Sequence, residues 1–252
     1  MPDGTDIVYR YDGSYQGFLC CVAESCNEKK MPQAIQLLDE PQGSLFPLRA
    51  IETRPGLAAQ VERSITERVS PEVKDMVRRG FLTCMEEKEL NLLRFILLGY
   101  RYGAQVIGLS TNDVVHRLDK ALLYLKNEAH YSLEFLRFAE CGGFLAAMLT
   151  PNNWVLPLIV GHFCERLNTE NFLIYDKNHG MGFVHRTGAR ERGEFFYAEA
   201  LELPEPTEEE ERYQELWRRF YDTIAVEGRI NPKLRRGNMP MRYWENMTEF
   251  QR

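Results

Sequence analysis

The stretch GLAAQVERSITERVSPEVKDMVRRGF, residues 56–81, carries the clearest secondary-structure signal of the chain. Its first apolar residues recur every four positions, at Leu57, Val61, Ile65 and Val69. That spacing places them on one face of a helix. Ser70-Pro71 restarts the pattern, because serine caps a helix N-terminus and proline suits the first helical position. The stretch therefore predicts two helices that meet at Ser70.

Two more helices are expected after this stretch. Leu90, Leu93, Leu97 and Tyr100 share one helical face. The polar run Ser110-Thr111-Asn112-Asp113 resembles a capping box, and helical spacing then continues to Leu125. Residues 56–125 thus read as a helical block.

Strand signals lie on both sides of this block. Residues 7–14, IVYRYDGS, alternate β-branched and aromatic side chains before an Asp-Gly-Ser turn, and a helix capped by Ser14 should follow. Other candidate strands cover residues 33–38, 48–53, 131–139, 144–150, 172–176 and 180–186. The predicted fold class is α+β, with a central helical block and a small, largely antiparallel sheet. We expect one integrated domain over residues 1–252, in which 204–252 form a linker, an acidic-capped helix and a basic aromatic tail.

Composition restricts the class of protein. The chain has 252 residues, of which 44% are hydrophobic and 27% are charged, as in ordinary globular proteins. It contains no apolar run near the roughly 20 residues that cross a bilayer, and no signal peptide is evident. Its six cysteines form no CxxC pair. We therefore expect a cytoplasmic protein with reduced cysteines, no metal, no cofactor and no membrane contact.

Charge is distributed unevenly despite a net value of −6. Residues 204–215, PEPTEEEERYQE, are acidic, whereas residues 229–242 carry five cations and no acid. Cations neutralise phosphates and aromatic rings stack on unpaired bases. The candidate nucleic-acid-binding residues are Arg229, Asn231, Lys233, Arg235, Arg236, Arg242, Tyr243 and Trp244. In the alternative interpretation, the aromatic residues pack back onto the helices and the arginines pair with the acidic run.

Catalytic candidates are few. Glu128 and His130 form a Glu-x-His pair that could supply a general base, and Asp176 lies near His179. Each has a structural alternative: His130 as a hydrogen-bonding histidine and Asp176 as a turn residue. The chain contains no P-loop, no GxSxG elbow and no HExxH motif.

Several long segments resemble a bacterial family described as probable DNA metabolism proteins. They lie at residues 11–20 (YDGSYQGFLC), 127–138 (NEAHYSLEFLRF), 150–167 (TPNNWVLPLIVGHFCERL), 172–180 (FLIYDKNHG) and 216–250 (LWRRFYDTIAVEGRINPKLRRGNMPMRYWENMTEF). The resemblance implies a stand-alone partner of a radical S-adenosylmethionine (radical SAM) protein for DNA modification or repair. A related domain occurs fused to uracil-DNA glycosylase-like proteins.

The function expected from this resemblance is that of a DNA-binding accessory protein in repair or modification. One alternative is an enzyme acting on nucleic acid or a modified nucleobase. Another is a protein-interaction scaffold that uses the acidic helix as its partner surface and makes no DNA contact.

Overall fold

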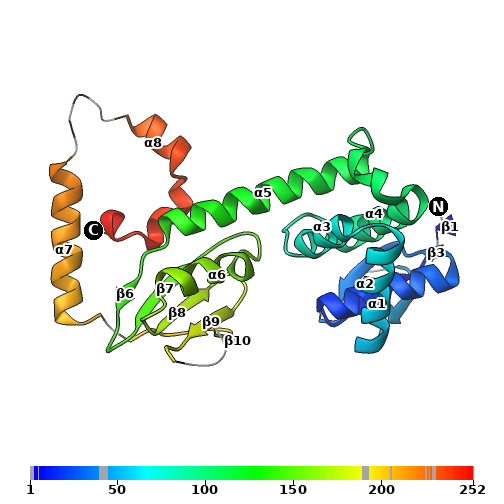
Figure 1. The fold of residues 1–252 in the computed structure, drawn as a ribbon, viewed down its shortest axis with the longest axis horizontal. Coiled ribbons are helices and arrows are strands. Elements are labelled where there is room, and N and C mark those ends of the chain that lie inside the picture. Colours follow the sequence, from blue (N-terminus) through cyan, green and yellow to red (C-terminus); the bar gives the residue numbers. More distant parts are fainter. Residues whose placement is uncertain are drawn as a thin grey trace. The chain divides into compact units, whose positions relative to one another are not determined.

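The fold was analysed in a computed structural model of the chain (Figure 1). The structure describes residues 3–4, 6–39, 45–188, 193–204, 206–224, 226, 228 and 231–251. The chain forms two compact units, residues 1–124 and 125–252. The expectation of one integrated domain stays a prediction.

The N-terminal unit contains a three-stranded parallel sheet. Its strand order is β4 (Ala34–Leu37), β2 (Val8–Tyr11), β5 (Leu48–Ala50). Helix α1 (Tyr15–Glu28) lies in the connection between β2 and β4. A crossover of this kind is required because the two strands are parallel. The short strands β1 (Asp3–Gly4) and β3 (Lys30–Met31) pair separately.

The turn between β2 and α1 forms as its sequence predicts. The Ser14 hydroxyl accepts a hydrogen bond from the Gly17 amide and caps α1. Asp12 accepts hydrogen bonds from Ser14 and, at 2.8 Å, from the Thr53 hydroxyl after β5. This polar cluster fixes the start of α1 at the carboxyl end of the central strand.

The predicted helical block is confirmed. It comprises α2 (Pro55–Arg68), α3 (Pro71–Phe81), α4 (Lys88–Tyr102), the 3₁₀ helix η1 (Gly103–Gly108) and the first part of α5 (Asp113–Phe135). Ser70 caps α3 by accepting from the Val73 amide. Apolar residues of the block pack with α1 into one core, in which Phe18, Ile65, Val77 and Leu92 are fully buried. Burial of this apolar surface is the main stabilising term of the unit.

Helix α5 extends further than its sequence suggests. The alternation after Tyr131 predicted a strand over residues 131–139. This prediction is wrong for residues 131–135, because the helix continues to Phe135. Tyr131 and Phe135 stack at 5.8 Å, which is the i,i+4 contact of one helical face. The Ser132 hydroxyl also donates back to the Glu128 carbonyl. Pattern alone cannot separate the two periods in so short an aromatic run.

The C-terminal unit is built on a five-stranded mixed sheet (Figure 1). The order is β10 (Glu194–Tyr197), β9 (Met181–His185), β8 (Phe172–Asp176), β7 (Leu145–Leu149), β6 (Ala139–Glu140). Strands β7 and β8 are parallel, joined by α6 (Leu156–Arg166), and the other pairs are antiparallel. The predicted turns at Cys141–Gly143 and between β8 and β9 are confirmed.

The C-terminal segment continues from the sheet into helices. Helix α7 (Glu208–Thr223) begins at Thr207, whose hydroxyl accepts from the Glu210 amide. It is followed by α8 (Pro232–Asn238) and the 3₁₀ helices η3 (Met241–Asn246) and η4 (Thr248–Phe250). Throughout the described ranges, none of the helices combines the length and apolar composition needed to cross a bilayer.

The α+β fold class is therefore confirmed. The expectation of a largely antiparallel sheet differs from the structure: β1 pairs with β3, β2 with β4 and β5, and β7 with β8, all in parallel.

Candidate functional site

Glu128 lies on the buried face of α5 with no exposed surface. Its carboxylate accepts hydrogen bonds from the Asn152 amide at 3.0 Å, the Asn153 amide at 2.7 Å and the Asn153 side chain at 2.6 Å. Arg242 Nη2 lies 3.1 Å from Glu128 Oε1. A buried carboxylate with these partners anchors the loop after β7 and the C-terminal segment.

His130 does not join Glu128. The helix continues through both residues, and a separation of two positions turns the side chains roughly 200° apart. His130 is exposed, and its Nε2 lies 3.1 Å from Glu134 Oε1. The structure therefore separates the two members of the predicted Glu-x-His pair.

Asp176 ends β8 and has two contacts with His179. Its Oδ1 accepts from the backbone amides of Asn178 and His179, which is the turn chemistry expected from the sequence. Its Oδ2 lies 2.7 Å from His179 Nδ1, and the Asp176 side chain is only 1% exposed. The His179 ring packs on Trp154 at 4.3 Å between centroids. Asp176 and His179 thus form a dyad backed by the indole ring of Trp154.

These groups meet at the carboxyl ends of the parallel strands β7 and β8. The Asn178 side chain donates to the Pro151 carbonyl at 2.8 Å, and Asn246 contacts the Thr150 hydroxyl at 3.4 Å. Lys177 Nζ lies 3.8 Å from a Glu245 carboxylate oxygen. We call residues 128, 150–154, 176–179 and 242–246 the edge cluster. The cluster brings together four of the segments on which the family resemblance rests.

Within the described ranges, no three His, Cys, Asp or Glu side chains are grouped so that they could hold a metal ion.

The predicted nucleic-acid residues divide into two groups. Arg229 lies outside the described residues. Asn231 caps α8 through its side chain, which accepts from the Leu234 amide at 3.0 Å. Arg242 binds Glu128, and Tyr243 packs against Tyr131 and Phe135 of α5. Part of the tail therefore packs onto its own unit. Arg242 pairs with Glu128 of α5, whereas the alternative interpretation expected the arginines to pair with the acidic residues 204–215.

Three tail cations remain exposed on α8: Lys233, Arg235 and Arg236. In the described part of the chain they pair with no carboxylate. Arg236 Nε donates to the Pro232 carbonyl, and the Arg235 guanidinium lies over the rings of Trp244 at 5.1 Å and Phe250 at 5.5 Å. Trp244 and Phe250 in turn stack at 4.4 Å. We call Lys233, Arg235 and Arg236 the basic strip.

Glu249 ties α7 to the rest of the unit. It is buried, and it accepts from Arg137 Nη2 at 2.8 Å and from Trp217 Nε1 at 3.2 Å. Burial by itself would raise the pKa of this carboxyl. The hydrogen bonds and the charge of Arg137 outweigh burial, so the pKa lies below its ordinary value.

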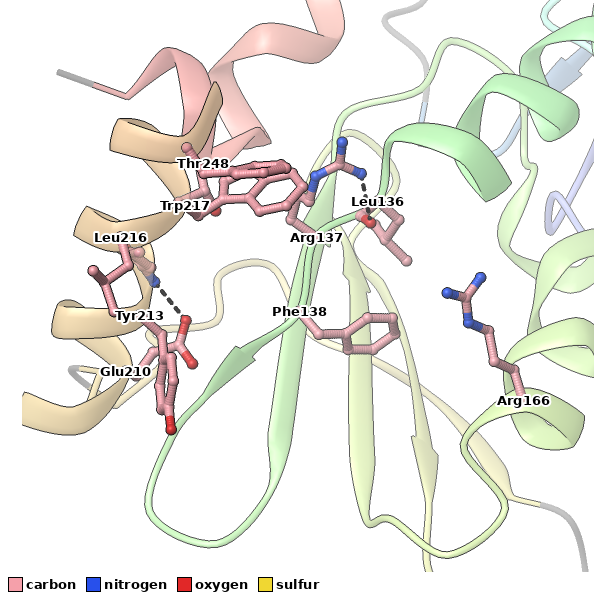
Figure 2. Close-up of a pocket in the computed structure, with 11 residues that line it drawn as sticks. Leu136, Arg137, Phe138, Arg166, Glu210, Tyr213, Leu216, Trp217 and Thr248 are labelled. Atoms are coloured by element: carbon pink, nitrogen blue, oxygen red, sulfur yellow. Dashed lines mark hydrogen bonds between the residues drawn. The ribbon is translucent and has the colours of Figure 1, made fainter. Parts of the chain in front are cut away.

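An open groove of about 860 Å³ lies between α7 and residues 136–138, which precede β6 (Figure 2). The sequence analysis did not predict this groove. One wall consists of α7 side chains, among them Tyr213, Leu216, Trp217 and Phe220. The other wall includes Leu136, Phe138 and Arg166. The spacing of the α7 residues was the available signal, but the opposite wall comes from segments distant in the sequence.

Comparisons with known proteins place the chain in one family. No curated protein and no solved structure matched the chain. A family model described as a domain of unknown function, DUF4130, matches residues 86–249, which is most of the chain. The chain therefore belongs to the DUF4130 family.

Proposed function

We propose that the protein is a DNA-binding accessory factor in DNA repair or modification and that it contacts nucleic acid through the basic strip of α8. The observation that carries the proposal is the exposure of three cations on this short helix, none of them paired with a carboxylate in the described part of the chain. The adjoining Trp244–Phe250 stack supplies aromatic surface beside these charges. Cations next to aromatic rings are the usual combination for single-stranded nucleic acid.

The family resemblance supports the same proposal. It implies that the protein works beside a radical SAM enzyme for DNA modification or repair. None of the six cysteines, all of which lie in the described ranges, forms a disulfide, which suits the reducing cytoplasm proposed as the location.

The test is binding of labelled single- and double-stranded DNA by wild type and by Lys233→Glu/Arg236→Glu. These two residues are chosen because Arg235 packs on Trp244, so its replacement would also disturb the fold. Arg63→Glu/Lys120→Glu is the matched control, with the same charge change at exposed sites of the N-terminal unit. The strip variant should lose binding and the control should retain it. Equal binding by all three proteins would refute the proposal.

The Asp176–His179 dyad favours a second candidate, an enzyme acting on nucleic acid or a modified nucleobase. A histidine oriented by a buried carboxylate is the usual arrangement of a general base. We expect His179→Gln to abolish any turnover of damaged or modified DNA while DNA binding is unchanged. If this variant keeps full turnover, His179 has no catalytic role.

A further inference from the structure

Helix α7 exposes an apolar stripe between Tyr213 and Phe220. Tyr213, Leu216, Trp217 and Phe220 recur at helical spacing and are 59%, 57%, 42% and 52% exposed. None of the α7 residues is buried in the structure as described. In a folded protein, the apolar stripe of an amphipathic helix normally packs against another part of the protein. Here the stripe forms a wall of the groove in Figure 2.

The geometry of the stripe suits a second helix. The stripe covers about two helical turns, or roughly 10 Å. Facing it across the groove, Leu136 and Phe138 supply further apolar surface. Anchors at this spacing in an apolar groove are typical of recognition of an amphipathic helix by its apolar face.

The charges around the groove define the partner further. Glu209 and Glu210 precede Tyr213 by four and three positions, so they share its face of α7. Within the described residues, Glu209 has no ion pair and Glu210 accepts only from Gln214. Two carboxylates at one end of an apolar stripe attract cations and repel phosphates. Arg166, exposed on the opposite wall, would face an acidic residue of the same partner.

We propose that this groove binds an amphipathic helix of a partner protein, and that lysine or arginine residues at one end of its apolar stripe face Glu209 and Glu210. The proposal is independent of the DNA-binding function, since it uses none of the basic strip. It differs from a general scaffold role because it fixes the surface and the chemistry of the partner.

The experiment is selection from a library of helical peptides of about four turns, long enough to span the stripe. The full chain is the bait, with counter-selection against Tyr213→Ser/Phe220→Ser. Both replaced side chains are more than half exposed, so the variant should keep its fold. Enriched peptides should share apolar residues at i, i+3 or i+4, and i+7, with lysine or arginine at one end. Enrichment of acidic peptides, or no enrichment over the counter-selected variant, would overturn the proposal.

A charge-reversal pair tests the orientation of the selected peptide. Glu209→Lys/Glu210→Lys should weaken its binding at least about tenfold, and a peptide with its cations replaced by glutamate should restore it. Glu208→Lys/Glu211→Lys is the matched control, because these residues lie on the other side of the same helical turn. Equal weakening by both variants would show that net charge, and not the groove, controls binding.

Oligothymidine distinguishes this proposal from the DNA-binding one. Loss of oligothymidine binding in Tyr213→Ser/Phe220→Ser, with normal binding by Lys233→Glu/Arg236→Glu, would make the groove a nucleic-acid site and overturn the helix proposal. Peptide binding that depends on the groove stands even if the wild type binds no DNA.

Discussion

Arg242 of η3 and Glu128 of α5 form an ion pair with an Nη2–Oε1 distance of 3.1 Å, and the Glu128 side chain is fully buried. The pair joins the C-terminal tail to the helix that enters the unit. Arg242 is one of the tail cations that the sequence predicted to bind DNA, but in the structure it pairs with a carboxylate of the protein.

Replacing Arg242 should destabilise the C-terminal unit. Arg242→Met removes one partner of the buried Glu128 carboxylate, which keeps its hydrogen bonds from Asn152 and Asn153. The free energy of unfolding should therefore fall by about 1–3 kcal/mol. Combined with Glu128→Gln, the loss should be less than additive by about 0.5–3 kcal/mol. Urea unfolding followed by tryptophan fluorescence measures both, since Trp154, Trp217 and Trp244 all lie in this unit.

Arg236→Met is the control, because Arg236 is exposed and should change stability by less than about 0.5 kcal/mol. Strict additivity of the Arg242 and Glu128 substitutions would show that the pair contributes nothing beyond its separate members.

Acid should weaken the contact between α7 and Glu249. The pKa of Glu249 is lowered in the folded protein, chiefly because hydrogen bonds and the charge of Arg137 overcome the effect of burial. A carboxyl whose pKa is lowered by folding stabilises the folded protein. This contribution is complete above the pKa of the unfolded chain, about 4.3, and is lost as the pH falls through the pKa of the folded protein. The stability difference between wild type and Glu249→Gln should therefore shrink on acidification below about pH 5. A difference that stays constant down to low pH would contradict this account.

Asp176 should stabilise the β8–β9 turn mainly through its acceptor oxygens. Asp176→Ala loses the bonds to Asn178, the His179 amide and the His179 ring, and we expect about 1–3 kcal/mol of destabilisation. Asp176→Asn keeps one acceptor oxygen and should cost less. Hydrogen exchange at the Asn178 and His179 amides reports the turn directly. Equal exchange rates in the two variants would be inconsistent with this role.

A side chain at Gly182 would meet the ring of Phe196. A Cβ there would overlap Phe196 Cζ across the β9–β10 pair, so Gly182→Ala must displace the Phe196 ring. We expect a loss of about 1–3 kcal/mol and faster amide exchange in β10. Gly161→Ala is the control: it lies in α6 with no heavy atom within 4 Å of its Cβ, and should stabilise by roughly 0.5–1 kcal/mol. Similar effects of the two substitutions would contradict the packing described here.

The elements that could be predicted are those with local causes. Ser14 and Ser70 cap helices through amides three positions further along the chain, and Asp176 closes its turn in the same way. Each contact depends on neighbours in sequence, so residue type and spacing are sufficient to predict it. The apolar spacing of residues 57–69 predicts α2 for the same reason.

The candidate site could be predicted only in part, because its contacts are long-range. Glu128 was a candidate from the sequence, but its partners Asn153 and Arg242 belong to a strand-end loop and to η3. Nothing in the spacing of those residues encodes that meeting. The proximity of Asp176 and His179 was visible, whereas the Trp154 ring beside them depends on the parallel pairing of β7 and β8.

The salt dependence of DNA binding tests the central claim most directly. For single-stranded DNA, each neutralised phosphate contributes about −0.7 to the slope of log K against log salt concentration. Lys233→Gln/Arg236→Gln should therefore weaken binding and reduce the steepness of the slope by about 1.4, while Arg63→Gln/Lys120→Gln should leave both unchanged. An unchanged slope in the strip variant, or no binding by the wild type at low salt, would contradict contact with DNA through α8.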